Sequence, residues 1–286
     1  MFVYPCNMNI LIVLIYTYLL SSNVSHSHEE VLGVNVLKNE VYGPYKRNKI
    51  DVFFPSTRVE NAPAILLIHG GAWIVGSKST WPSSIIKGLV EQGYVVVSMN
   101  YRFACGDFKK QMEDVQMAVN FIHEKRRTWK IAADKLGLAG VSAGGHMALL
   151  FAQAYDSSHL VKAVVSLAGP TDLTDTLFRQ YLHNYCLGFV LKKFLGASLK
   201  DNRQLYVEAS PIFHSQGVPC LFINGQNDNL VPAEQAFRMY DSLRLKEIVT
   251  DTILLSNTGH YIYGKKNVNI DTLIKSIVTW MGTFLR

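Results

Sequence analysis

Short apolar runs rich in β-branched residues alternate with helix-length stretches along most of this chain. The apolar runs predict strands at Ile50–Phe54, Ala64–His69, Tyr94–Met99, Leu136–Val141, Val161–Leu167, Pro219–Asn224 and Thr252–Ser256. Helices are predicted at Ser83–Gln92, Lys109–Arg127, Gly144–Tyr155, Glu234–Leu245 and Val268–Phe284, and Val31–Leu37 is a candidate antiparallel edge strand. This alternation predicts an α/β fold, with a mostly parallel central sheet and helices on both faces.

Length and composition suit one folded domain of this class. The chain has 286 residues, of which 49% are hydrophobic and 17% charged, so it can bury a large sheet. No Pro/Gly/Ser-rich linker divides it, and residues 28–286 are predicted to form a single domain. Between Leu173 and Pro211, aromatic and helical patterns occur without a strand. We expect this insertion, residues 173–211, to be a small cap over the fold, here called the cap.

The N-terminal segment has the pattern of a secretory signal peptide. The first 28 residues contain no Lys, Arg, Asp or Glu, and an apolar run from Ile10 to Leu20 is followed by small polar residues. This run is shorter than the roughly 20 apolar residues of a membrane span. We therefore predict a signal peptide at residues 1–27, cleaved after Ser27, and secretion of the mature chain. The segment lacks a basic start, which leaves an uncleaved membrane anchor as the alternative.

Charge and cysteine content argue against several classes of partner. The net charge of +6 is spread along the chain, so neither nucleic acid nor an obligate protein partner is indicated, and membrane contact is expected only through an uncleaved N-terminus. Without Cys6 the mature chain would hold Cys105, Cys186 and Cys220, an odd number. Cys220 lies in a predicted core strand, and a Cys105–Cys186 disulfide stays open. No cysteines have metal-ligand spacing, so no structural metal is expected.

A G-x-S-x-G motif identifies a candidate nucleophile. Residues 140–144 read Gly-Val-Ser-Ala-Gly and join a predicted strand to a predicted helix, which is the context that this motif requires. The turn holds the serine at strained backbone angles, and its glycines let strand and helix approach. Ser142 would then lie at a helix N-terminus, where the amide of Ala143 faces a developing oxyanion.

A second motif supplies the rest of a predicted oxyanion hole. His69-Gly70-Gly71-Ala72-Trp73 follows a predicted strand, at the place where folds with a G-x-S-x-G turn provide their other N–H donors. Small residues there allow backbone amides to point into the site, and we assign Gly71 and Ala72 as donors. Trp73 is predicted to be a wall of the substrate pocket, with plain packing as the alternative.

Asp228 and His260 are the best candidates to activate the serine. A serine hydroxyl needs a base, and the base needs a carboxylate that fixes its tautomer. Each of the two residues follows a predicted strand, and the order Ser142, Asp228, His260 is the one typical of this motif. Among the other histidines, His146 and His69 are predicted to be structural.

The motifs together resemble the α/β-hydrolase superfamily, in its esterase branch around the hormone-sensitive-lipase-like and BD-FAE-like groups. The resemblance rests on residues 69–73, 76–78, 98–102, 114, 140–146, 209–211, 228–232 and 259–260. It implies an α/β-hydrolase fold and hydrolysis of a small-molecule carboxylic ester through an acyl-enzyme on Ser142, with no metal or organic cofactor. Many relatives carry glycine where this chain has Ala72, but the backbone amide survives that change.

The same fold and motifs also occur in proteins with other functions, so alternatives stay open. An arylformamidase that cleaves N-formylkynurenine shares the oxyanion motif and the Ser-Asp-His set, although the secretion signal counts against it. A peptidase resembling the prolyl oligopeptidase catalytic domain is disfavoured because no propeller precedes the hydrolase. A catalytically inactive binding module on the same fold is disfavoured because Ser142, Asp228 and His260 are all present. The sequence does not identify the ester.

Overall fold

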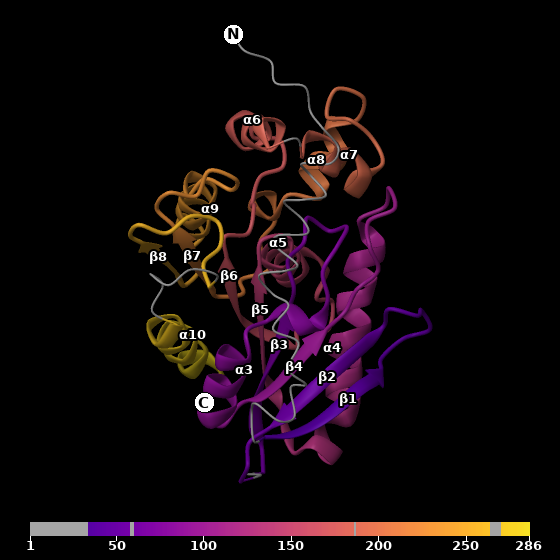
Figure 1. Ribbon diagram of the computed structural model, residues 1–286, viewed down its shortest axis with the longest axis vertical. Helices are drawn as coiled ribbons and strands as arrows, with labels where there is room; N and C mark the ends of the chain where they lie inside the picture. Colours follow the sequence, from indigo (N-terminus) through magenta and orange to yellow (C-terminus); the bar gives the residue numbers. More distant parts are fainter. Residues whose placement is uncertain (1–33, 58–59, 186, 264–269) are drawn as a thin grey trace.

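A single eight-stranded sheet forms the centre of the molecule (Figure 1). The computed structural model describes residues 34–57, 60–185, 187–263 and 270–286, so the predicted signal peptide lies outside the described residues. The strands run in the order β1-β2-β4-β3-β5-β6-β7-β8. Their bounds are β1 Asn35–Val41, β2 Lys49–Phe54, β3 Ala62–Ile68, β4 Val95–Met99, β5 Ile131–Val141, β6 Val161–Leu167, β7 Cys220–Gly225 and β8 Thr250–Leu255.

The sheet is parallel from β4 to β8, and antiparallel pairing is confined to the two neighbours of β2. β2 pairs antiparallel with both β1 and β4, whereas all other neighbours pair parallel. The predicted α/β fold with a mostly parallel sheet is therefore confirmed. Because parallel strands end at the same edge, the loops after β3, β5, β7 and β8 all leave from one side of the sheet.

Alternating side chains on each strand build two cores, one on each face. On β3, Leu66 and Ile68 belong to one cluster of buried residues, whereas Ile65 and Leu67 belong to the other. Helices α4 Lys109–Trp129, α5 Ala143–Leu150 and α9 Glu234–Arg244 cover the first face. Helices α3 Ser83–Glu91 and α10 Ile270–Leu285 lie side by side on the second (Figure 1).

The observed bounds differ most from prediction at β5 and β1. β5 begins at Ile131 rather than Leu136, because Ile131 pairs with Ala62 of β3 before a register shift, although Asp134 and Lys135 make this stretch polar. β1 is the expected antiparallel edge strand but occupies Asn35–Val41, with a bulge near Asn39, whose φ is 59°. The helix after Ser142 changes at residue 151 into a π-helical turn, Phe151–Tyr155.

Between β6 and β7 the chain forms short helices and no strand within the described residues. These are α6 Thr176–Asn184, α7 Gly188–Leu195, α8 Arg203–Glu208 and the 3₁₀ turn η3 Pro211–Phe213. In Figure 1 they lie together beyond α5, on the side of the sheet where the parallel strands end. Phe178 and Phe194 of the cap are buried in the core, whereas Tyr185 and Phe189 are exposed.

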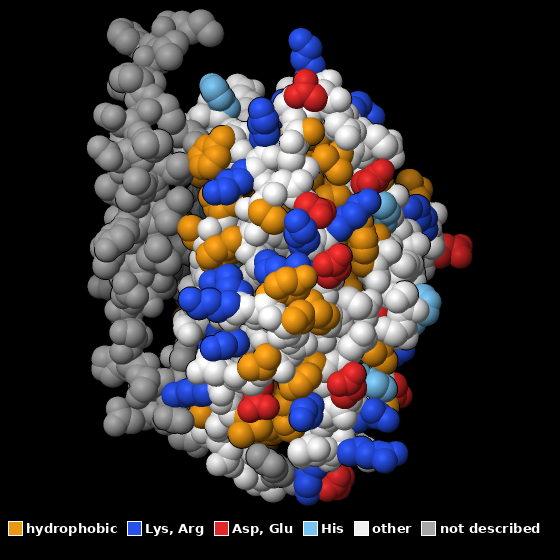
Figure 2. All heavy atoms as spheres, turned by 90° about the vertical axis from the view of Figure 1, so that its right-hand side faces the viewer, with side chains coloured by type: hydrophobic (Ala, Val, Ile, Leu, Met, Phe, Trp, Pro, Cys, Tyr) orange, Lys and Arg blue, Asp and Glu red, His pale blue; other side chains and the backbone are white. Residues whose placement is uncertain are grey.

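Charges of both signs are mixed on one face of the molecule. Figure 2 shows one face of the molecule, on which lysines and arginines alternate with acidic and hydrophobic side chains. The exposed side chains of Lys130 and Glu60 form an ion pair at 2.6 Å. Among the described residues, no helix is both long enough and apolar enough to span a membrane.

Candidate active site

Ser142 lies in the sharp turn between β5 and α5. Its φ of 53° and ψ of −120° are strained for a residue with a side chain, and its N–H donates to Leu167 O at 2.7 Å. The flanking glycines are required by space: a Cβ at Gly140 would overlap the carbonyl oxygen of Gly144, and one at Gly144 would overlap that of Ile68. Strand and helix therefore meet closely enough to present Ser142 at the helix N-terminus.

The structure brings Ser142, His260 and Asp228 into one chain of hydrogen bonds. His260 Nε2 lies 2.9 Å from Ser142 Oγ, and His260 Nδ1 lies 2.9 Å from Asp228 Oδ2. The Asp228 side chain is fully buried, whereas 12% of the His260 side chain is exposed. The two partners of the serine come from the loops after β7 and β8, at the edge of the sheet where β5 also ends.

Hydrogen bonds from its own loop hold Asp228 in place. Asp228 Oδ1 accepts the N–H groups of Leu230 at 2.9 Å and Val231 at 2.8 Å, which leaves Oδ2 for His260. A carboxylate at Nδ1 favours the tautomer with the proton on Nδ1, so Nε2 is free to accept the serine proton. The arrangement is chemically able to deprotonate Ser142.

The loop after β3, here called the oxyanion loop and comprising residues 69–76, lies against the nucleophile. A Cβ at Gly70 would stand 3.4 Å from Ser142 Cβ. Gly71, Ala72 and Trp73 have φ values of 116°, 50° and 61°. Within the described part of the chain, the backbone N–H groups of Gly71, Ala72 and Ala143 donate no hydrogen bond.

Trp73 lies inside the protein and makes ring contacts. Only 3% of its surface is exposed, its ring stacks on Phe194 of α7 at 4.5 Å, and it meets the His146 ring edge-on at 5.2 Å. The packing alternative therefore accounts for its observed contacts. A role as a wall of the substrate pocket stays a prediction.

The hydrogen bonds that hold the oxyanion loop involve His69, which was predicted to be structural, and two residues that the sequence did not place in the site, Tyr101 and Arg47. His69 Nδ1 donates to Gly70 O at 2.6 Å, and Tyr101 OH donates to His69 O at 3.1 Å. Arg47, from the turn between β1 and β2, donates to Tyr101 O and to Gly76 O. The Asn-Tyr-Arg stretch at residues 100–102 pointed to this region, but nothing in the sequence links Arg47 to it.

Both histidines that were predicted to be structural are neutral and buried. Burial lowers the pKa of His69 to about 3 and that of His146 to about 4. Burial also raises the pKa of the Cys220 thiol to about 12, which agrees with an inert core residue. Cys186 lies outside the described residues.

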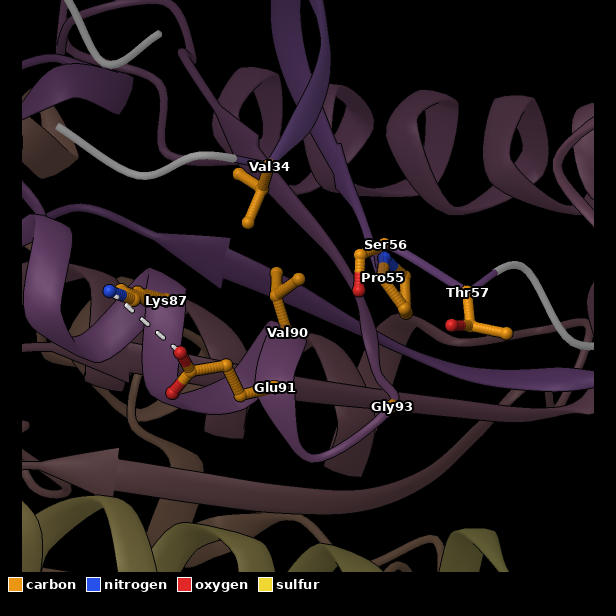
Figure 3. Close-up of a pocket in the computed structure, with 8 residues that line it drawn as sticks. All are labelled: Val34, Pro55, Ser56, Thr57, Lys87, Val90, Glu91 and Gly93. Carbon is orange, nitrogen blue, oxygen red and sulfur yellow. Dashed lines mark ion pairs between the residues drawn. The ribbon is translucent and has the colours of Figure 1, made fainter. Parts of the chain in front are cut away.

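A pocket of about 550 Å³ lies at the opposite edge of the sheet (Figure 3). Its lining includes Pro55 and Thr57 after β2, Val90 of α3 and Gly93 before β4, with an ion pair between Lys87 and Glu91 at 3.8 Å. Since Ser142 follows the carboxyl end of β5, this pocket belongs to the other end of the parallel strands. None of the candidate catalytic residues lines it.

Comparison with known families agrees with the fold and with the motifs. The BD-FAE family model matches residues 50–243, which is more than half of the chain. The chain belongs to the BD-FAE family. This is an esterase-type family of α/β-hydrolases, and the match covers Ser142 and Asp228 but ends before His260.

Curated relatives of this BD-FAE chain include bacterial and plant proteins. It is 28% identical to the probable carboxylic ester hydrolase LipM of Mycobacterium tuberculosis over 71% of this chain and 50% of LipM. It is 25% identical to the probable isoprenylcysteine alpha-carbonyl methylesterase ICMEL1 of Oryza sativa, over 85% of this chain and 62% of that protein. The chain thus spans about half to three-fifths of the length of these relatives.

Solved esterase structures share the fold of this BD-FAE chain. Esterase B from Lactobacillus rhamnosis superposes with a TM-score of 0.77 at 18% identity, covering 96% of this chain and 93% of that one. A truncated carbohydrate esterase from gut microbiota gives a TM-score of 0.73 at 20% identity, over 87% and 95% of the two chains. Both likenesses support the α/β-hydrolase fold.

Proposed function

We propose that this protein is a serine carboxylesterase that hydrolyses small-molecule esters with Ser142 as nucleophile. The continuous hydrogen-bond chain from Asp228 through His260 to Ser142 carries the proposal, since it is the arrangement that turns a serine hydroxyl into a nucleophile. The names of the relatives, a carboxylic ester hydrolase and a methylesterase, support ester hydrolysis as the reaction class.

In the acylation step, Ser142 Oγ attacks the ester carbonyl carbon while His260 Nε2 takes the hydroxyl proton. The imidazolium that forms is stabilised by the buried carboxylate of Asp228. The tetrahedral intermediate then collapses, and His260 returns the proton to the departing alcohol. In deacylation, a water molecule attacks the acyl-enzyme, His260 accepts its proton, and Ser142 leaves with that proton as the acid is released.

The oxyanion of both tetrahedral intermediates would bind the N–H groups of Gly71, Ala72 and Ala143. These donors have no partner among the described residues and lie on the loop and helix that flank Ser142. Loss of one such donor typically costs about 2.7–4 kcal/mol of transition-state stabilisation. The mechanism uses only side chains and backbone of this chain and requires no cofactor.

We also retain the proposal that the protein is secreted. It rests on the apolar run from Ile10 to Leu20 and the small residues after it. Expression in a secreting host and N-terminal sequencing of protein from the medium test it. A chain that begins at His28 would support cleavage after Ser27, whereas an intact N-terminus in the membrane fraction would favour the anchor.

Hydrolysis of p-nitrophenyl esters, from acetate to decanoate, tests the enzymatic function. The full chain and Ser142→Ala are compared at equal concentration. Activity in the first and its loss in the second would support Ser142, and the profile over chain length would show the size of acyl group accepted. Equal, negligible rates would contradict the esterase proposal. N-formylkynurenine would then be tested as substrate, and inactivity there would leave the binding module.

A further inference from the structure

The backbone of the oxyanion loop is held in an unfavourable conformation. Gly71, Ala72 and Trp73 are three consecutive residues with positive φ, and two of them carry a Cβ. Left-handed backbone is uncommon for residues other than glycine, and it persists only where surrounding contacts enforce it. Since the directions of the Gly71 and Ala72 amides depend on these angles, whatever enforces them also aims the proposed oxyanion donors.

The side chain of Trp73 is held by contacts with two other elements. Its indole Nε1 donates to His146 Nδ1 at 3.3 Å, and its ring stacks on Phe194 at 4.5 Å with an interplanar angle of 15°. Its backbone oxygen accepts the N–H of Ala104 at 2.8 Å. The ring of His146 also meets Phe194 edge-on, so three rings from the oxyanion loop, α5 and α7 contact one another.

His146 joins this cluster to the end of the cap. It is fully buried on α5, one turn after Ser142, and its Nε2 donates to Ala209 O at 2.7 Å. With that proton on Nε2, the neutral ring has a lone pair on Nδ1, which is what the Trp73 N–H requires. One tautomer therefore satisfies both bonds, and the lowered pKa of His146 agrees with a neutral ring.

We propose that His146 is a positioning residue that holds the oxyanion loop in its catalytic geometry through the indole of Trp73. The inference rests on the proposed esterase function and deepens it. His146 contacts the loop and the cap through Trp73 and Ala209, whereas Ser142 Oγ is hydrogen-bonded to His260 and, within the described ranges, to no other side chain. Its loss should therefore weaken oxyanion binding and leave activation of the serine intact.

Trp73→Phe is the least disruptive test. It keeps an aromatic ring against Phe194 and removes the N–H that binds His146. The variant and the wild type are assayed with p-nitrophenyl acetate and with its thionoester, in which C=S replaces C=O. Sulfur is the weaker acceptor, so a thionoester gains less from the oxyanion donors. We expect kcat for the ester to fall roughly tenfold, less than the 10²–10³ typical of losing a donor outright. The thionoester should lose less, and KM should change little.

His146→Leu tests the same link from its other end. The variant should lower the ratio of ester to thionoester rates as Trp73→Phe does. The double variant should be no worse than the more impaired single one, because both remove one interaction. Rates are expressed per titrated active site, so that unfolded protein does not count, and Trp73→Phe keeps the test possible if His146→Leu does not fold.

Trp81→Phe is the matched control. Trp81 is as buried as Trp73, but it packs near Tyr263 on the other face of the sheet, and its Nε1 has no hydrogen-bond partner among the described residues. Trp81→Phe removes the same atoms as Trp73→Phe, so it should change the stability of the fold but neither kcat nor the ratio of ester to thionoester rates.

The proposal is overturned if Trp73→Phe changes KM and not kcat, which would make Trp73 a substrate contact. It is also overturned if the ratio of ester to thionoester rates stays at the wild-type value in both variants. Wild-type protein without esterase activity would instead contradict the function on which the inference rests.

Discussion

His69 and His146 are two buried histidines whose protonation opposes folding. Both side chains are fully buried, and burial lowers their pKa values from 6.5 to about 3 and about 4. In the unfolded chain each would bind a proton near pH 6.5. Between that value and its lowered pKa, the unfolded state holds more protons than the folded state. The contribution of the two neutral histidines to the free energy of unfolding is therefore fully present above pH 6.5, and it is lost as the pH falls toward 4.

The size of the loss follows from the same values. At pH 5, the solution is about 1.5 units below the unfolded pKa and still above both folded values. At about 1.36 kcal/mol per unit, each histidine then costs about 2 kcal/mol of unfolding free energy, or about 4 kcal/mol for the two. This is a large part of the 5–15 kcal/mol that typically stabilises a folded protein, so it is measurable.

Urea unfolding at pH 8 and pH 5 tests this prediction, with the free energy obtained by linear extrapolation. For the wild type we expect a fall of about 4 kcal/mol from these two groups, and for His146→Leu a fall about 2 kcal/mol smaller. His159→Asn is the control: His159 is exposed, its φ is 52°, and asparagine tolerates that conformation. A fall equally large in His146→Leu and wild type would refute the assignment of this loss to His146.

Three further predictions follow from the site and the core. Asp228→Asn should keep the fold but lower kcat by about 10⁴, measured with p-nitrophenyl acetate, because an amide can stabilise the wrong tautomer of His260; a loss under tenfold would contradict the proposed role of Asp228. Gly144→Ala should lower the unfolding free energy by at least the roughly 1–3 kcal/mol of overpacking, since its Cβ would overlap Ile68 O; an unchanged Tm would count against the close packing of strand and helix. Native protein treated with a thiol reagent at pH 8 should be labelled at the exposed Cys105 and not at Cys220, whose pKa is raised to about 12 by burial. Mass spectrometry before and after urea would show this, and native labelling of Cys220 would contradict it.

The fold could be predicted from the sequence because burial on both faces leaves a strong signal. Strands such as Val161–Leu167 are continuous apolar runs, and the structure has this strand within the predicted bounds. The signal fails where pairing, not burial, extends a strand. Residues 131–135 join β5 because Ile131 pairs with Ala62, and Asp134 and Lys135 are polar. Such a pairing partner lies far along the chain and leaves no local pattern.

The residues of the candidate site could be predicted in two ways, from a local motif and from the positions at which strands end. Ser142 sits in a motif that its own neighbours define, and Asp228 and His260 could be placed because parallel strands end at a common edge. In the structure, His260 lies 2.9 Å from Ser142, which is 118 positions away in the sequence, and 2.9 Å from Asp228, which is 32 positions away.

The support of the oxyanion loop could not be predicted in this way. Two of its residues with positive φ are Ala72 and Trp73, and because neither is glycine, the sequence does not indicate this conformation. The conformation depends on rings from α5 and α7 and on the tautomer of His146, which is set by a carbonyl 63 positions further along the chain. The proposed nucleophile, base and acid can thus be placed by motif and order, whereas the proposed oxyanion donors depend on contacts that arise only once the cap has packed against the sheet.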